Sequence, residues 1–501
     1  MTDVRTTTEA GRRGRGERSG PDRRWLALGV IAGAQLMTAL DATIVNIALP
    51  SAQRALGFGD AQRQWVVTAY TVCFAGLLLF GGRVADTFGR RRSFQIGLAG
   101  FGLASLLAGL APGLPVLLAG RALQGAFAAL IAPTVLSLLA VTFTEPRERA
   151  KAFAIYGAVA SSGAATGLLL GGMLTGYLDW RWCLFVNVAL SGVVLAAGRS
   201  VLPDPPRFAA GLDAGSAVLA TGGLATLVFG FSQAAGRGWS SAAVLGALVG
   251  GAIMLGAFGL RQARVARPLL PPRILADRGR AGAYLAAAAA VVGAFGMFLI
   301  LTYYLQVVLH YSPARAGLAV LPMTLANTLS GYQLGNRLMP HLPPRVMIAG
   351  GLLVAAAGLA VMTRLTPHGG YLMPILPGEV LIGTGMGALF PPAFQLAVRG
   401  VAQRDAGVAS AMINAATQVG GSIGTAVLNT IAVGATATYL ATHARTPAAH
   451  VAALVHGYAN ATGWAAALLV VMAAVAFVLV RTPGPAAGRA AGRDTTATEQ
   501  S

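Results

Sequence analysis

The sequence predicts an all-α integral membrane protein with about fourteen transmembrane helices. The first reason is composition, because 55% of the 501 residues are hydrophobic and only 11% are charged, whereas soluble domains carry about 25% charged residues. The second is length, since charged and Pro/Gly-rich breaks leave apolar stretches of roughly 18 to 25 residues, which suits a tilted spanning helix. The third is the position of the cationic residues.

Those cationic residues define a topology. A net charge of +20 could indicate a nucleic-acid-binding protein, but such a protein carries its basic face on a soluble domain. Here 29 of the 37 Lys and Arg residues fall on alternate segments between spans, and seven fall on the intervening ones. Because cytoplasmic loops are the Lys/Arg-rich ones, we expect both termini in the cytoplasm, a lipid bilayer as partner and no nucleic acid.

The spans divide into two halves at the Pro- and Arg-rich segment 261–280. We expect a disordered basic tail (1–24), an N-terminal six-helix bundle (25–201), an inserted transmembrane hairpin with linkers (202–282), a C-terminal six-helix bundle (283–480) and a disordered cytoplasmic tail (481–501). The spans should lie near 25–49, 64–82, 94–111, 116–140, 152–176, 182–201, 215–233, 242–260, 283–308, 315–336, 346–363, 372–396, 408–433 and 463–480.

A weak internal repeat supports the two halves. Gly82 to Arg92 aligns with Gly335 to Arg345, and each segment pairs a glycine with an arginine ten residues later. Two related bundles of this kind are a known transporter plan. The longest outer segment, Gly434 to Thr462, we expect to be a loop with a short helix.

Several function classes are excluded. The chain has one lysine, Lys151, so it lacks the Gly-Lys-Ser/Thr phosphate loop of an ATP-driven pump. Cys73 and Cys183 lie in or beside apolar spans, which argues against disulfide and metal sites. No Ser/His/Asp or His/carboxylate cluster lies on one segment. We therefore expect neither an enzyme nor a cofactor or metal.

Asp41 is the charged residue of the first span. It lies about two thirds of the way along the otherwise uncharged stretch from Trp25 to Pro50. An acid in hydrocarbon costs roughly 2.5 to 3.5 kcal/mol on insertion scales, so it usually serves a proton, an ion or a substrate. The alternative is a structural aspartate that is hydrogen-bonded near Asn46.

The loop from Gly82 to Arg92 reads GRVADTFGRRR and joins two spans. It resembles the signature loop of the major facilitator superfamily, although Arg83 and Thr87 exchange the usual small and basic positions. The resemblance implies that this loop latches helix ends and the opposite bundle in the outward-open state. The latch residues would be Gly82, Asp86, Gly89, Arg90, Arg91 and Arg92. The alternative is a positive-inside loop with a tight turn.

Further motifs narrow the resemblance. Leu40 to Pro50 reads LDATIVNIALP and resembles the first-span signature of the fourteen-span drug:proton antiporters, the EmrB/QacA-like family. Similar motifs are Arg121 to Gly125, Trp180 to Trp182 with Phe185 and Asn187, and Tyr311 to Pro313 with Gly317 and Pro322. The resemblance covers about residues 24 to 482.

The fifth span carries a glycine face. Gly163, Gly167 and Gly171 recur every four residues and Gly172 follows, so a neighbouring helix can approach closely. Exporters of the superfamily normally carry G-P-x-x-G-G here, and this chain lacks the proline. The glycine face that favours export is kept.

Three ionisable residues lie at similar depths in their predicted spans. At 1.5 Å per residue, Asp41, Arg121 and Glu379 lie roughly 12, 8 and 10 Å below the outer ends of their spans. We expect a shared polar cavity and hypothesise that Asp41 is the coupling protonation site. The resemblance gives Arg121 a part in proton transfer or charge compensation, with a structural hydrogen-bonding role as the alternative. Glu379, after Pro377 and Gly378, is expected with Asp41 and Arg121 among the proton-coupling residues as a cavity carboxylate, and the alternative is a wetted boundary residue.

The most favoured function is proton-coupled export of an amphipathic drug or antibiotic by a monomer in a bacterial cytoplasmic membrane. An uptake symporter and a non-transporting membrane sensor are the alternatives. Adaptable aromatic and Met side chains suit several amphipathic substrates. The expected substrate-cavity residues are Asn46, Gln124, Tyr303, Tyr304, Gln306, Asn414 and Gln418.

Overall fold

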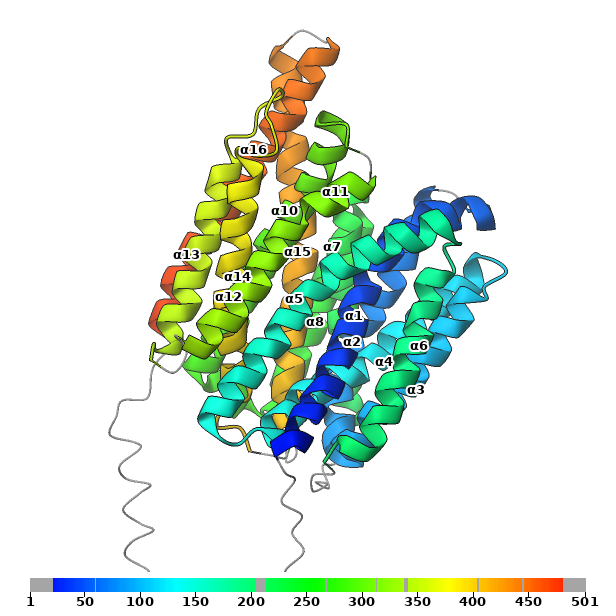
Figure 1. Ribbon diagram of the computed structural model, residues 1–501, viewed down its shortest axis with the longest axis vertical. Coiled ribbons are helices and arrows are strands. Elements are labelled where there is room, and N and C mark those ends of the chain that lie inside the picture. The colour runs from blue at the N-terminus through cyan, green and yellow to red at the C-terminus, as the bar shows by residue number, and fades with distance from the viewer. Residues whose placement is uncertain are drawn as a thin grey trace, which may run out of the picture.

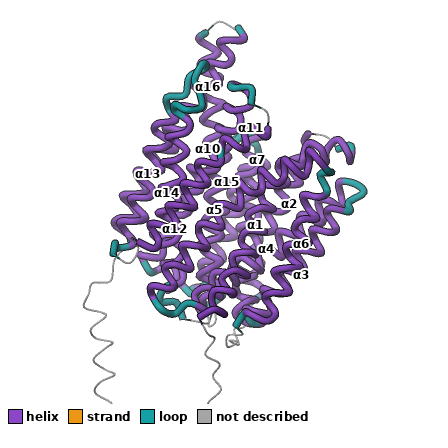
Figure 2. Tube along the Cα trace, viewed as in Figure 1, coloured by secondary structure: helices purple, strands orange, loops and turns teal. Residues whose placement is uncertain are grey.

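The computed structural model describes residues 21–58, 60–203, 213–265, 268–311, 313–337, 341–402, 405–443 and 446–480. Within these ranges the chain forms helices joined by short loops, and no β-strand occurs (Figure 2). Helices suit this apolar sequence because each helix satisfies its own backbone N–H and C=O groups, which lipid cannot do. The expected tails 1–20 and 481–501 lie outside the described residues.

Fourteen of the described helices have at least 17 residues, and nine are apolar enough by composition to cross a membrane. They are α1 (Pro21–Leu56), α2 (Asp60–Phe88), α3 (Arg90–Gly109), α4 (Leu114–Thr142), α5 (Pro146–Tyr177), α6 (Trp182–Val201), α7 (Ala214–Arg237), α8 (Ala242–Gln262), α10 (Arg278–Tyr303), α12 (Leu321–Arg337), α13 (Pro344–Met362), α14 (Ile375–Val398), α15 (Ala406–Thr442) and α16 (Pro447–Leu479). Three short helices are α9 (Pro272–Ala276), the π-helix η1 (Tyr304–Val308) and α11 (Pro313–Ala319).

The long helices pack as two groups (Figure 1). Helices α1 to α6 pack against one another, as do α10 and α12 to α16. The α7–α8 hairpin packs against α2 of the first group and α15 of the second, and further contacts between the groups join α2 to α15 and α5 to α12. The first residue of α1 and the last of α16 lie at the same end of the molecule. The exact domain boundaries stay predictions.

Three segments differ from the sequence-based expectation. Helix α1 begins at Pro21, inside the expected tail. The span expected at 315–336 is two helices, α11 and α12, which meet at Val320. The expected outer loop Gly434 to Thr462 is largely helical, because α15 and α16 continue through it and project beyond the other helices (Figure 1). Alanine-rich sequence favours helix even where it leaves the apolar period.

Polar contacts join the start of α7 to the end of α8, at the end of the hairpin opposite its connecting loop. Asp213 caps α7 by accepting hydrogen bonds from the N–H groups of Gly215 and Ser216, at 3.1 and 3.3 Å. Arg261 of α8 donates two bonds to the same carboxylate, at 2.9 and 3.0 Å. These bonds from Arg261, with those from Ser216, hold the pKa of Asp213 well below its ordinary value.

The glycine face of α5 packs directly on α1. An added Cβ would lie 2.5 Å from Ala39 Cβ at Gly163 and 2.1 Å from Thr43 Oγ1 at Gly167. At Gly171 it would lie 2.9 Å from Ile44 Cγ1. The prediction of a packing face is confirmed for these three glycines. It is wrong for Gly172, which faces open space because it is one residue out of the four-residue period.

This contact predicts the effect of Gly167→Ala. The new methyl group must displace Thr43 and the carbonyl oxygen of Leu40, which an added Cβ would approach to 2.8 Å. Overpacking of this kind costs about 1–3 kcal/mol. We expect a lower thermal unfolding midpoint for the purified protein in detergent. Gly172→Ala is the matched control and should leave the midpoint unchanged, and equal midpoints for both variants would contradict the packing argument.

Candidate functional site

A buried ion pair joins α1 to α4. Arg121 Nη1 donates to Asp41 Oδ2 at 2.7 Å, and the two residues are 1% and 0% exposed. Arg121 Nε also donates to the backbone oxygen of Val66, at 3.3 Å, and its guanidinium lies 4.5 Å from the ring centre of Tyr70. The expected proximity of Asp41 and Arg121 is confirmed. Each charge is compensated by the other, which lowers the cost of burying both.

Two amides complete the coordination of the carboxylate. Asn187 Nδ2 of α6 donates to Asp41 Oδ1 at 2.6 Å, and Gln124 Nε2 of α4 donates to the same oxygen at 3.1 Å. Gln124 Oε1 accepts from Arg121 Nη1 at 2.8 Å, and its amide nitrogen lies 2.7 Å from Ser105 Oγ of α3. Gln124 is three residues after Arg121, so both side chains leave α4 on one face. Helices α1, α4 and α6 thus meet at one carboxylate, and α3 joins them through Gln124.

These contacts decide what the cluster can do chemically. Asp41 accepts three hydrogen bonds, which suits an ionised carboxylate. Removing one partner of a buried ion pair costs about 3–5 kcal/mol, because the other charge is left uncompensated. Protonation of Asp41 would likewise leave Arg121 with a weaker partner. The cluster can therefore couple the arrival of a proton to a rearrangement of α1 against α4.

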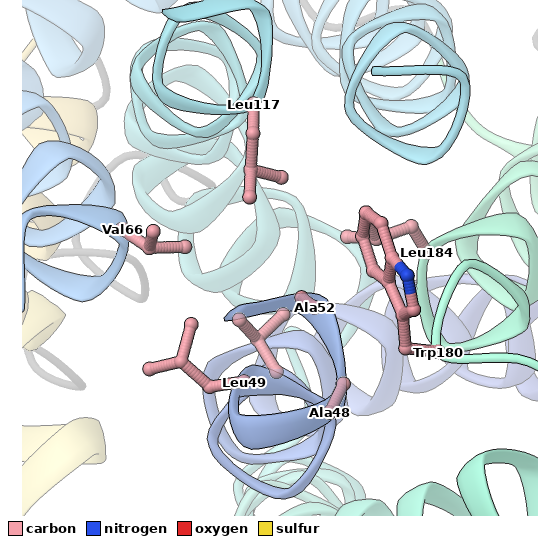
Figure 3. A pocket seen from close by; sticks show the side chains of 8 residues that line it. Ala48, Leu49, Ala52, Val66, Leu117, Trp180 and Leu184 are labelled. Carbon is pink, nitrogen blue, oxygen red and sulfur yellow. The ribbon is translucent and has the colours of Figure 1, made fainter. Parts of the chain in front are cut away.

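An apolar pocket lies next to the cluster along α1 and α4. Val45 lies one turn after Asp41 along α1, and Leu117 lies one turn before Arg121 along α4. Figure 3 shows Leu49, Val66, Leu117 and Trp180 around one small space, which Val45, Ala48, Ala52 and Leu184 also line. A small space lined only by apolar side chains stays dry, because a buried water needs polar partners. Apolar side chains thus flank the buried ion pair on this side.

Glu379 lies outside this cluster. It is fully buried on α14, and its hydrogen-bonding partner is Tyr371, in the segment before that helix. Gly383, one turn later on α14, faces Met323 of α12. The structure therefore places Glu379 within the second helix group, and the three residues do not form one cluster. Burial also removes the alternative of a wetted boundary residue.

The expected cavity residues do not gather in one place. Gln124 is fully buried in the ion-pair cluster, and Tyr304 is buried, with its hydroxyl donating to the backbone oxygen of Thr366 at 2.7 Å. Gln306 is exposed. Asn414 bonds to the carbonyl of Ser410 on its own helix, and Gln418 is half-buried on α15. The side chains of Asn46 and Tyr303 lie outside the described part of the structure. Spacing alone did not reveal which helix faces meet.

The loop between α2 and α3 binds the second helix group. Both carboxylate oxygens of Asp86 lie 3.2 Å from the backbone nitrogen of Gly407, in the first turn of α15. Arg90 Nη2 donates to Asp86 Oδ1 at 3.1 Å. A carboxylate is favoured there because the first N–H groups of a helix lack partners and carry positive partial charge. An added Cβ at Gly82 would lie 2.7 Å from the Gly407 oxygen, so the two helices touch.

The remaining loop residues have separate places. Gly89 has φ of 100°, in the left-handed region that favours glycine, and it separates α2 from α3. Arg91 donates to the backbone oxygen of Arg199 at the end of α6. Arg92 is exposed. These positions agree with a loop that fixes helix ends, although Arg92 faces outward.

Arg83, where the superfamily signature has a small residue, also reaches the second group. It donates to the backbone oxygen of Pro268 at 3.0 Å and lies 3.6 Å from Asp405, the residue directly before α15. Arg273 of α9 pairs with the other oxygen of Asp405 at 2.5 Å. The linker between the halves is thereby held to the same helix end. Neither Asp405 nor Arg273 stood out in the sequence, because their partners are more than 100 residues away.

Ser105 is the other functional residue that the sequence did not reveal. It is one hydroxyl in an apolar span, and its side chain also donates to the backbone oxygen of Phe101. Asn187 was recognisable only as part of a motif. The available signal in the sequence would have been a polar side chain at the same depth in its span as a charged residue in a neighbouring span.

The chain is similar in sequence to known proteins. A family model described as the Major Facilitator Superfamily matches residues 31–425. The chain is 51% identical over 466 residues to the puromycin resistance protein pur8 of Streptomyces alboniger, with 92% of each chain covered. It is 42% identical over 435 residues to the cephamycin export protein CmcT of Amycolatopsis lactamdurans, covering 86% of this chain and 88% of that one.

A solved structure has the same fold. The crystal structure of the human organic anion transporter MFSD10 (TETRAN) matches with a TM-score of 0.64, over 92% of this chain and 100% of that chain. At 16% sequence identity, this likeness concerns the fold alone.

The contact between Asp86 and α15 predicts the effect of Asp86→Asn. The neutral amide loses the charge-assisted bonds to Arg90 and Gly407, each worth about 1.5–3 kcal/mol. We expect the ends of α2 and α15 to separate in a larger fraction of molecules. Spin labels at the exposed residues Phe88 and Ala402 would measure this as a longer, broader distance distribution. Arg92→Gln, on the same loop, is the control, and identical distributions for Asp86→Asn and the unmodified protein would refute the latch.

Proposed function

This chain belongs to the Major Facilitator Superfamily, and we propose that it exports an antibiotic or a similar amphipathic molecule from the cell and so confers resistance. The observation that carries this proposal is the 51% identity to a puromycin resistance protein over 92% of both chains. The relative named as a cephamycin exporter favours the same direction of transport. The protein is a membrane transporter and not an enzyme.

Proton coupling is the second part of the proposal. Asp41 is the site that exchanges a proton, and Arg121, Gln124 and Asn187 hold its ionised form. A proton on Asp41 removes the negative charge and frees Arg121 to seek another partner. That change biases the packing of α1 against α4 and α6, and so the balance between the two access states. The proton gradient then drives export.

The cytoplasmic latch gives the access states a physical basis. In the described conformation Asp86 and Asp405 tie α2, α9 and α15 together at one end of the molecule. Opening toward the cytoplasm requires these contacts to break, whereas opening on the other side leaves them in place. Alternating access then consists of rocking of one helix group against the other.

The finer assignments are also proposals. We assign the chain to the fourteen-span drug:proton antiporters of the EmrB/QacA-like family, supported by fourteen long helices among the described residues. The charge bias supports cytoplasmic termini in a bacterial cytoplasmic membrane. The substrate contacts the surfaces where the two helix groups face each other, as in other transporters of this plan.

Asp41→Asn tests the coupling site. Asparagine keeps the shape and can still accept bonds from Arg121, but it cannot exchange a proton. In liposomes with the purified protein and an imposed pH gradient, puromycin should evoke proton flux through the unmodified protein. We expect this flux to fall at least tenfold in Asp41→Asn, together with growth resistance in cells.

Asp179→Asn is the matched control, because Asp179 is an exposed acid in a surface ion pair with Arg181. It should transport normally. Full coupled flux in Asp41→Asn would refute the assignment of Asp41. A panel of cephamycin, lipophilic cations and neutral antibiotics extends the test to other substrates. Proton-driven accumulation of a compound in the direction of uptake would favour an uptake symporter instead.

A further inference from the structure

Glu379 is a second buried acid in the protein, with surroundings unlike those of Asp41. It is 0% exposed in the second turn of α14, and its Oε1 atom has no hydrogen-bond partner among the described residues. Arg121 faces Asp41, whereas no Lys, Arg or His forms an ion pair with Glu379 in the described part of the chain. An ionised carboxylate so placed would be strongly disfavoured.

The hydrogen bonds of Tyr371 add an independent constraint. Its hydroxyl oxygen lies 2.6 Å from the backbone oxygen of Ala319 and 3.0 Å from Glu379 Oε2. A tyrosine hydroxyl has one hydrogen, and a backbone carbonyl can only accept. The shorter contact uses that hydrogen for Ala319. The contact to Glu379 is then a hydrogen bond only if Glu379 carries the proton and donates it to Tyr371.

The other titratable groups nearby leave this conclusion in place. Tyr311 interacts with Tyr371, and the guanidinium of Arg315 on α11 lies 4.0 Å from the ring centre of Tyr311. Tyr304 donates to the backbone oxygen of Thr366. Between α13 and α14, Arg364 and His368 are exposed, and α12 carries its single arginine, Arg337, at the opposite end.

We propose that Glu379 is a second proton-binding site, separate from Asp41, and that its protonated form joins the outer end of α14 to the end of α11 through Tyr371. Helix α11 also contacts α5 of the first helix group. Loss of the proton would leave a negative charge on Glu379 that faces the hydroxyl of Tyr371. This charge would compete with the backbone oxygen of Ala319 for the hydroxyl hydrogen. The joint between α14 and α11 would then open, and water would reach Glu379.

The consequence for transport rests on the export function proposed above. Two independent acids allow two protons in each cycle, one at the junction of α1, α4 and α6 and one in the second helix group. Glu379→Gln keeps a donor for Tyr371 but cannot release a proton. It should therefore favour the joined state without preventing opening, and lower the number of protons moved for each substrate by one, while Asp41 still couples.

Infrared spectroscopy of the reconstituted protein tests the protonation state without any transport. The unmodified protein and Asp41→Asn should both show a carbonyl band of a protonated carboxylic acid that shifts in heavy water. Glu379→Gln should lack that band. Tyr371→Phe should keep it at a shifted frequency, because the acid loses its hydroxyl partner. Absence of the band from Asp41→Asn at neutral pH would overturn the proposal, since Glu379 would then be ionised.

Transport measurements test the second part. With puromycin as the probe, a proton-to-substrate ratio lower by one in Glu379→Gln supports a coupling site, and an unchanged ratio overturns it. Failure of the export proposal has a different signature, because the infrared band would be present while no compound evokes flux in the unmodified protein. That result would also refute coupling at Glu379 but leave its bound proton established.

Discussion

The ion pair between Asp41 and Arg121 is the interaction on which the first half of the protein depends. A helix bundle in lipid gains little from hiding apolar surface, since the lipid is equally apolar. A buried charge, in contrast, destabilises the fold by about 3–5 kcal/mol when its partner is removed. The pair and its two amide neighbours therefore fix α1, α3, α4 and α6 relative to one another.

Close packing supports this arrangement from the opposite side of α1. The glycine face of α5 contacts Ala39, Leu40, Thr43 and Ile44, which flank Asp41 along the helix. Helix α1 thus lies between a polar cluster and a bare backbone surface.

Buried acids also hold the two ends of the molecule. At one end Asp86 accepts a hydrogen bond from the free N–H of Gly407 in the first turn of α15, and Asp405 beside it pairs with Arg83 and Arg273. At the other end the proposed proton on Glu379 keeps Tyr371 bonded to α11. The two ends differ in kind, since one holds ionised carboxylates against cations and the other a neutral acid. A transporter that opens alternately needs two such closures that do not break together.

The sequence by itself determined that the protein is an all-helical membrane protein, that it belongs with the exporters, and that Asp41, Arg121 and Asp86 are charged residues in or beside apolar spans. These follow from composition, from charge in apolar spans and from local motifs, which depend on near neighbours in the chain. Only the tertiary structure decided that Gln124 donates a hydrogen bond to Asp41 and that Glu379 lies away from that pair, next to Tyr371. It also decided that Gly172 faces open space and that Arg83 lies beside Asp405. The contacts of Gln124 and Arg83 join residues far apart in sequence, and the rotation of each helix about its axis, which composition leaves undetermined, selects all of them.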